Sequence, residues 1–186
     1  MDQATVSLIR EAQSGDSEAF HRLVATYDFQ VMSLAMKLLQ HKQDAEDLYQ
    51  EVFMKVFMNI RNFRFESDFF TWLYRITVNT AFNFKNRMRK HYRLESGLDQ
   101  DEDDLNWIPD PDTSSVENSR EVQTAVMKAV DKLPQKQRTV FILKNLENLK
   151  IKDIAVLLDC GEGTIKKYLF RAMEKLRVDL RDYRYV

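Results

Sequence analysis

Apolar residues recur every three to four positions through most of this chain, which is the spacing of one buried face of an α-helix. The pattern predicts helices at about 3–13, 17–40, 43–60 and 68–90. The expected core positions of the second helix are Phe20, Leu23, Val24, Tyr27, Val31, Leu34, Ala35 and Leu38. Helix breakers are scarce, with four glycines and three prolines among 186 residues, so we expect an all-α fold.

The breaks between these helices contain capping residues. "SGD", residues 14–16, combines a glycine that ends one helix with an aspartate that caps the next. "RNFRFES", residues 61–67, predicts an irregular loop, with Ser67 as the expected N-cap of the following helix. Further along, a capping box from Ser114 to Glu117 begins a fifth helix, and Pro134 suits the first turn of a sixth.

Two short helices at about 150–158 and 162–181 end the chain, joined by the turn "DCGE", in which Gly161 is available for a positive φ. The core positions of the last helix are Ile165, Leu169, Ala172, Met173 and Leu176. The positions left exposed are Thr164, Lys166, Lys167, Tyr168 and Arg171. A helix, a glycine-bearing turn and a helix with a basic outer face form the helix-turn-helix layout that reads the DNA major groove. The alternative is a helical hairpin with an ordinary solvated basic face.

Charge is distributed unevenly along the chain. Residues 94–118 carry no Lys or Arg, nine Asp or Glu and two prolines, which predicts an acidic flexible linker between two small domains, 1–93 and 119–186. The first domain has a net charge of +2 and the second of +6. This partition indicates a polyanionic partner contacted by both ends of the chain. The linker is either a plain tether or a segment that docks through Trp107 and Ile108 when a partner is bound.

Composition excludes several classes of protein. The one cysteine, Cys160, rules out an internal disulfide and suits a reducing compartment. No apolar run is long enough to span a bilayer and no signal peptide is evident, so we expect a cytoplasmic protein that does not insert into a membrane. His21, His41 and His91 lack ligand-spaced companions, and no phosphate loop or nucleophile elbow appears. We expect neither an enzyme nor a metal or cofactor site.

The third predicted helix, "DAEDLYQEVFMKVF", turns Ala45, Leu48, Val52, Phe53 and Val56 to the core. Its other face contains Asp44, Asp47, Gln50, Glu51 and Met54. An acidic helix face repels DNA, so a partner on this ridge should be a basic protein surface. The alternative is solvated charge that supports the first helical turn.

The fourth predicted helix, "FFTWLYRITVNTAFNFKNRMRK", leads from aromatic into basic residues. Phe69, Leu73, Ile76 and Thr80 can pack inward, leaving Trp72, Arg75 and Asn79 on another face, followed by Lys85, Arg87 and Lys90. Rings that stack on bases beside cations that contact phosphates suit nucleic acid with unstacked bases. The alternative is that Trp72 and Tyr74 complete the core.

These segments resemble the extracytoplasmic-function (ECF) group of bacterial RNA polymerase sigma factors. The resemblance lies in "DAEDLYQEVFMKVF", "FRFESDFFTWLYRITVNTAFNFKNR" and "LPQKQRTVFILKNLENLKIKDIAVLLDCGEGTIKKYLFRAMEKLR", in the family's order, and covers roughly residues 8–92 and 119–180. It implies a first domain that docks on the clamp of core RNA polymerase and melts the minus-ten element. It implies a second domain that sits on the polymerase flap and reads the minus-thirty-five element. Control by an anti-sigma factor is also implied.

The resemblance assigns roles to residues of this chain. The residues that it implies for docking on the clamp are Asp44, Asp47, Gln50, Glu51 and Met54. Contacts to opened minus-ten DNA fall to Arg61, Arg64, Phe65, Ser67, Trp72, Arg75, Asn79, Lys85 and Arg87. Contacts to the minus-thirty-five duplex fall to Thr164, Lys166, Lys167, Tyr168 and Arg171.

The chain departs from the family at a few positions. Phe65 stands where the family often has glycine, and "NLK", residues 148–150, replaces a familiar "GLS". In the last helix "GTIKKYL" replaces the common "GTVKSRL". Two alternatives remain at this point: a helix-turn-helix regulator with an N-terminal helical sensing domain, and a helical adaptor that binds only proteins.

Overall fold

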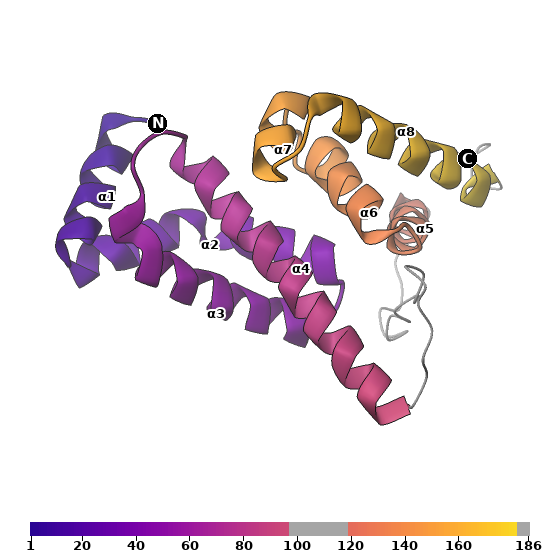
Figure 1. Ribbon diagram of the computed structural model, residues 1–186, viewed down its shortest axis with the longest axis horizontal. Coiled ribbons are helices and arrows are strands. Elements are labelled where there is room, and N and C mark those ends of the chain that lie inside the picture. Colours follow the sequence, from indigo (N-terminus) through magenta and orange to yellow (C-terminus); the bar gives the residue numbers. More distant parts are fainter. Residues whose placement is uncertain (97–118, 182–186) are drawn as a thin grey trace. The chain divides into compact units, whose positions relative to one another are not determined.

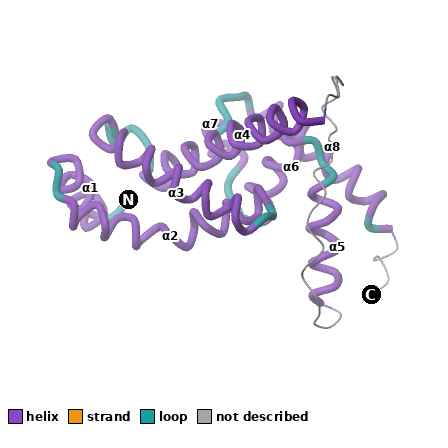
Figure 2. The backbone as a smooth tube through the Cα atoms, turned by 90° about the horizontal axis from the view of Figure 1, so that it is seen from below, coloured by secondary structure: helices purple, strands orange, loops and turns teal. Residues whose placement is uncertain are grey.

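A computed structural model describes the backbone of residues 1–96 and 119–181, and the side chains of residues 1–88 and 124–181. The described backbone consists of helices joined by short loops (Figure 2), which confirms the all-α fold. The chain divides into two compact units, of which the first contains α1 to α4 and the second α5 to α8. The expected capping box at 114–117 and the residues Trp107 and Ile108 lie outside the described residues.

The N-terminal unit has four α-helices in its described part (Figure 1). They are α1 (Gln3–Ser14), α2 (Ser17–Leu39), α3 (Lys42–Asn59) and α4 (Phe69–Ser96), with a 3-10 turn, Ile60–Asn62, after α3. α2 packs against the other three helices, and α4 packs against α3. Leu34, Leu48 and Leu73 are fully buried where these helices meet. α4 continues beyond the ends of α2 and α3 and passes the expected end at residue 90.

Capping side chains set the helix boundaries of this unit. Gly15 ends α1 with a φ of 102°, and the Asp16 carboxylate accepts hydrogen bonds from the N–H groups of Glu18 and Ala19 at the start of α2. Both features confirm the interpretation of "SGD". The expectation for Ser67 is wrong, because Asp68 directly precedes α4 and its carboxylate accepts the Phe70 N–H at 2.9 Å. The Ser67 hydroxyl donates to the Asp68 carbonyl instead.

The C-terminal unit contains α5 (Ser119–Asp131), α6 (Gln135–Phe141), α7 (Ile151–Leu157) and α8 (Glu162–Asp179) in its described part. A turn of π-helix, Ile142–Leu146, follows α6, and Pro134 occupies the N-cap position of α6 rather than its first turn. α8 packs against α5, α6 and α7. The fully buried side chains Val130, Val140, Ile142, Leu143, Ile154 and Ile165 form the core.

A buried ion pair joins α5 to α6. Arg138 donates to Asp131 while both side chains are almost inaccessible, at 4% and 6% exposure. Burial lowers the pKa of the Arg138 guanidinium, and the Asp131 carboxylate opposes that shift. Because a buried charge without its counter-ion is costly, this pair makes the α5–α6 corner dependent on both partners.

Candidate polymerase and nucleic-acid interfaces

One exposed face runs the length of α3. Asp47 and Gln50 are exposed, Glu51 is half-buried and Met54 is 64% exposed. The face continues through Phe57 and Met58, which are 60% and 68% exposed and which the sequence analysis missed. Positions 47, 51, 54 and 58 follow the three-to-four spacing of one helix face, so extending that series would have found Met58. We call Asp47, Gln50, Glu51, Met54, Phe57 and Met58 the α3 face; it is acidic towards the helix start and apolar towards its end.

Asp44 lies three positions before Asp47 on the same side of α3, but it is less exposed. It is half-buried in the first turn of α3, and its carboxylate lies 3.6 Å from the His41 imidazole. Its backbone N–H donates to Nδ1 of the same histidine at 3.4 Å. These contacts give Asp44 a local role at the helix start, where a negative charge also suits the helix dipole.

Glu51 and Arg87, which the sequence assigned to two different partners, form an ion pair. Arg87 extends from α4 and donates to Glu51 Oε2 at 2.5 Å, while Lys55 lies 2.8 Å from Oε1. The hydrogen bond from Arg87, together with Lys55, lowers the pKa of Glu51, although partial burial opposes the shift. The same bond raises the pKa of Arg87. The Glu51–Arg87 ion pair therefore connects the α3 face to the basic part of α4.

The loop between α3 and α4 is tethered to α1. Gln13 donates hydrogen bonds to two backbone carbonyls of the loop region, and the Arg10 guanidinium lies 5.7 Å from the centroid of the Phe65 ring. Arg61, Arg64 and Ser67 are exposed on the loop. Sequence reasoning did not identify Gln13 or Arg10, because no local pattern links them to a segment so distant in the chain.

An aromatic cluster lies beneath this loop. Trp72 is half-buried and its ring lies 5.2 Å from that of Phe63 and 5.4 Å from that of Phe69. Phe63 also contacts Phe65 at 5.0 Å. Trp72 is thus neither a fully buried core residue nor a free ring, whereas Tyr74 is 1% exposed and belongs to the core. The aromatic residues at the start of α4 therefore divide between this cluster and the core.

Polar residues follow Trp72 along α4. Arg75 and Asn79 are exposed, and their positions relative to Trp72 place all three on one side of the helix. Phe69, Leu73 and Thr80 are buried, as expected, and Ile76 is half-buried. Lys85 is half-buried further along the helix, and the side chain of Lys90 lies outside the described residues.

The second unit contains the expected helix-turn-helix, formed by α7 and α8. Thr164, Lys166, Lys167 and Arg171 are exposed on the first half of α8, while Tyr168 is half-buried rather than exposed. Phe170 is 67% exposed and was missed, and Met173 is 48% exposed rather than buried. The buried stripe of α8 is narrower than the sequence pattern predicts and contains Ile165, Ala172 and Leu176.

The turn between these helices differs from the prediction. Asp159 has the positive φ, of 50°, whereas Gly161 has a φ of −71° and serves as the N-cap of α8. Aspartate tolerates the left-handed region better than most residues, so the glycine is not required for it. The Cys160 N–H closes the turn on the Ala155 carbonyl at 3.0 Å.

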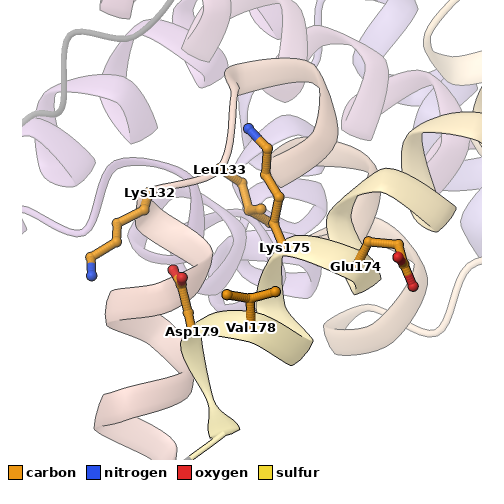
Figure 3. Close-up of a pocket in the computed structure, with 6 residues that line it drawn as sticks. All are labelled: Lys132, Leu133, Glu174, Lys175, Val178 and Asp179. Atoms are coloured by element: carbon orange, nitrogen blue, oxygen red, sulfur yellow. The ribbon is translucent and has the colours of Figure 1, made fainter.

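A pocket of about 340 Å³ lies away from this basic face, between the end of α5 and the second half of α8 (Figure 3). Lys132, Leu133, Glu174, Lys175, Val178 and Asp179 line it. Two lysines and two carboxylates share its wall, so its charge does not match a phosphate backbone. Across the described residues, no three His, Cys, Asp or Glu side chains gather as metal ligands, and no helix there is long and apolar enough to cross a membrane.

Both units match known sequence families. The family model "Sigma-70 region 2" matches residues 23–93 in the first unit, and "Sigma-70, region 4" matches residues 123–176 in the second. The ECF RNA polymerase sigma-E factor of Haemophilus influenzae is 36% identical over 94% of this chain and 93% of its own length. The chain belongs to the ECF group of RNA polymerase sigma factors. The RNA polymerase sigma-H factor of Pseudomonas aeruginosa is 32% identical over 91% of this chain and 90% of its own.

Solved structures agree with this assignment. The sigma factor RpoE of Bartonella quintana, solved with the anti-sigma factor NepR, is 26% identical with a TM-score of 0.65, covering 87% of this chain and 96% of that chain. CnrH, solved with the cytosolic domain of CnrY, shares the fold with the same TM-score at 21% identity, covering 94% of this chain and 96% of the other.

Membership defines the function of the chain. This sigma factor binds core RNA polymerase and promoter DNA and directs promoter-specific transcription initiation; it is not an enzyme. The match to region 2 decides against a helix-turn-helix regulator with a sensing domain, because residues 23–93 then belong to the initiation machinery. It also decides against an adaptor that binds only proteins.

Proposed function

We propose that the two units divide promoter recognition between them. Residues 1–93 dock on the polymerase clamp and open the minus-ten element, residues 119–186 sit on the flap and read the minus-thirty-five element, and residues 94–118 link them. The separate matches to regions 2 and 4 support this division. The protein works in the cytoplasm, where its polymerase and promoters are.

The α3 face docks on the clamp through Asp47, Gln50 and Glu51, with Asp44 beside them at the helix start. Its apolar end adds Met54, Phe57 and Met58. Exposed Met and Phe beside carboxylates suit a partner surface that is basic and partly apolar. Asp47→Lys should weaken core polymerase binding, measured by titration, and leave the unfolding midpoint unchanged. Glu18→Lys, on an exposed position of α2, is the matched control. Equal affinities for the two variants would refute docking through this face.

Opened minus-ten DNA binds at the loop and the adjoining face of α4. The single observation that carries this proposal is the half-buried Trp72 ring on its aromatic support, with Arg64, Arg75 and Asn79 exposed nearby. A ring held by neighbours but open on one side can stack on an unpaired base, and the cations can contact phosphates. The proposed surface also includes Arg61, Phe65, Ser67, Lys85 and Arg87.

A comparison of promoter melting with duplex binding tests the minus-ten assignment. Trp72→Ala should reduce affinity for a fork with a single-stranded minus-ten segment by about 1–3 kcal/mol, because one stacking partner is lost. Asn79→Ala should act in the same direction. Affinity of the holoenzyme for the closed duplex should change little. Equal losses on fork and duplex would argue against single-strand recognition.

The basic half of α8 reads the minus-thirty-five duplex. Thr164, Lys167 and Arg171 recur at helical spacing, with Lys166 and Tyr168 beside them, and no carboxylate interrupts the series from 163 to 173. Arg171→Ala should weaken duplex binding and leave melting of an already bound promoter unaffected. An anti-sigma factor holds the protein inactive; the relative RpoE, solved in complex with the anti-sigma factor NepR, supports this. Co-purification from the native organism tests that part.

A further inference from the structure

Gln13 of α1 makes two hydrogen bonds to a segment almost fifty residues away. Its side-chain amide donates to the Ile60 carbonyl at 2.9 Å and to the Phe63 carbonyl at 2.8 Å. Both bonds are partly buried, which strengthens them relative to exposed contacts. The two carbonyls accept from the same nitrogen, so both of its protons are used.

These carbonyls lie at the point where α3 ends and the loop begins. The Phe63 N–H closes the 3-10 turn on the Ile60 carbonyl at 3.0 Å. Gln13 therefore contacts both ends of the turn: the Ile60 carbonyl, which accepts the hydrogen bond of the turn, and the carbonyl of Phe63, whose N–H donates it. One amide group thus fixes the direction in which the chain leaves α3. Phe63 itself is 5% exposed and anchors the turn on the core side. The next residues, from Arg64 on, are those that face opened DNA in the proposed function.

A second residue of α1 supports the loop beyond this turn. Arg10 lies three positions before Gln13, on the same helix face, and its guanidinium is 5.7 Å from the Phe65 ring centroid. Phe65 has a φ of 59°, a conformation that a bulky residue adopts only when its surroundings impose it. The ring contacts to Arg10 and Phe63 supply that constraint.

We propose that Gln13 is a positioning residue for base selection: through the Ile60 and Phe63 carbonyls it sets the geometry of loop 61–67 and thereby the base preferred at the minus-ten element. This inference rests on the proposed minus-ten role of the loop. Gln13 makes its contacts to the protein backbone, so its effect on DNA is exerted through the loop. Discrimination between bases depends on hydrogen-bonding groups held within about half an ångström of the productive geometry.

Selection from a library tests this. Holoenzyme reconstituted with core polymerase is presented with fork DNA whose single-stranded minus-ten segment is randomised, and the bound fraction is sequenced. Gln13→Met keeps the length of the side chain without a donor. This variant should lower the ratio between the most frequent and the second most frequent base at one minus-ten position by about tenfold. That is the discrimination that one well-formed hydrogen-bonded contact provides. Gln13→Lys restores a donor and should recover the ratio. Gln3→Met, an exposed glutamine on the same helix, is the matched control and should leave it unchanged.

Each result has a distinct meaning. If the wild-type holoenzyme selects no base in the fork, the proposed minus-ten role and this inference both fail. If it does select a base and Gln13→Met keeps that preference, the inference alone fails. Circular dichroism shows whether Gln13→Met is folded. Should it not be, Gln13→Lys decides, because a folded Lys variant without base preference also overturns the inference.

Discussion

At the scale of single residues, Phe65 and Asn148 have an unusual backbone conformation. Both have a positive φ, of 59° and 56°. Glycine adopts this region without strain, asparagine tolerates it, and phenylalanine does not. The left-handed backbone at Phe65 therefore carries a cost in strain.

A pair of substitutions at Phe65 isolates this strain. Both Phe65→Ala and Phe65→Gly remove the ring contacts, but only alanine keeps the Cβ. We expect the glycine variant to be the more stable by about 1 kcal/mol in urea unfolding, because a Cβ is disfavoured at this φ. At an ordinary helical position the order reverses: Ala25→Gly, exposed in α2, should cost about 1 kcal/mol. An alanine variant as stable as the glycine variant would contradict a left-handed Phe65.

At the scale of helices, the Glu51–Arg87 pair joins α3 to α4. Arg87 is 58% exposed, so solvent screens the pair and its contribution is modest. A double-mutant cycle with Glu51→Gln and Arg87→Gln should give a coupling of about 0.2–1 kcal/mol near neutral pH. The hydrogen bond from Arg87 holds the pKa of Glu51 below its ordinary value of 4.5. The stabilisation is therefore complete above that value and is lost as the pH falls through the lower, folded-state pKa.

The measurement is the cycle repeated by urea unfolding at about pH 6 and about pH 3. Coupling should shrink at the lower pH, because Glu51 is then protonated in the unfolded chain and the folded-state ion pair must compete with that protonation. Lys42 and Glu46, an exposed pair within α3 with 3.8 Å between charged atoms, provide the reference cycle. A Glu51–Arg87 coupling that is unchanged by acid would exclude a charged pair.

The connection between the two surfaces also has a consequence for binding. Glu51 belongs to the α3 face and Arg87 to the surface proposed for opened DNA, so each is engaged by the other in the protein alone. Glu51→Gln should raise the affinity of the isolated protein for single-stranded DNA, because Arg87 no longer has a carboxylate beside it. Filter binding at low salt measures this. A fall in affinity would show that Glu51 orients Arg87 for DNA instead.

Sequence patterns predicted the helices well because periodicity reflects burial, which decides where helices pack. The ends of α2 and α3 lie within one residue of the prediction, whereas α4 runs six residues further. Contacts between distant polar groups were not predictable: Gln13 and Phe63 are 50 positions apart, and Glu51 and Arg87 are 36 apart. Their pairing depends on how the helices cross, and no local spacing records it. The same reason explains Met173, whose exposure depends on what packs against α8.

At the scale of the whole molecule, the division into two compact units predicts that they unfold independently. Asp131→Asn tests this, because it removes the carboxylate that compensates the buried Arg138 charge. Loss of one partner from a buried pair costs about 3–5 kcal/mol, which is a large part of the stability of a small domain. Hydrogen exchange should therefore accelerate in α6 and α8.

The same variant should leave exchange in α2 and α4 unchanged, since each of those helices packs within the first unit. Asp179→Asn, an exposed carboxylate of α8, is the control and should alter neither region. If Asp131→Asn accelerates exchange in both units together, the two halves share one cooperative unfolding transition and the proposed division of labour loses its structural basis. If only the second unit responds, the first should still bind core polymerase when α8 no longer reads the duplex. A polymerase titration of the variant then separates docking from minus-thirty-five recognition in one molecule.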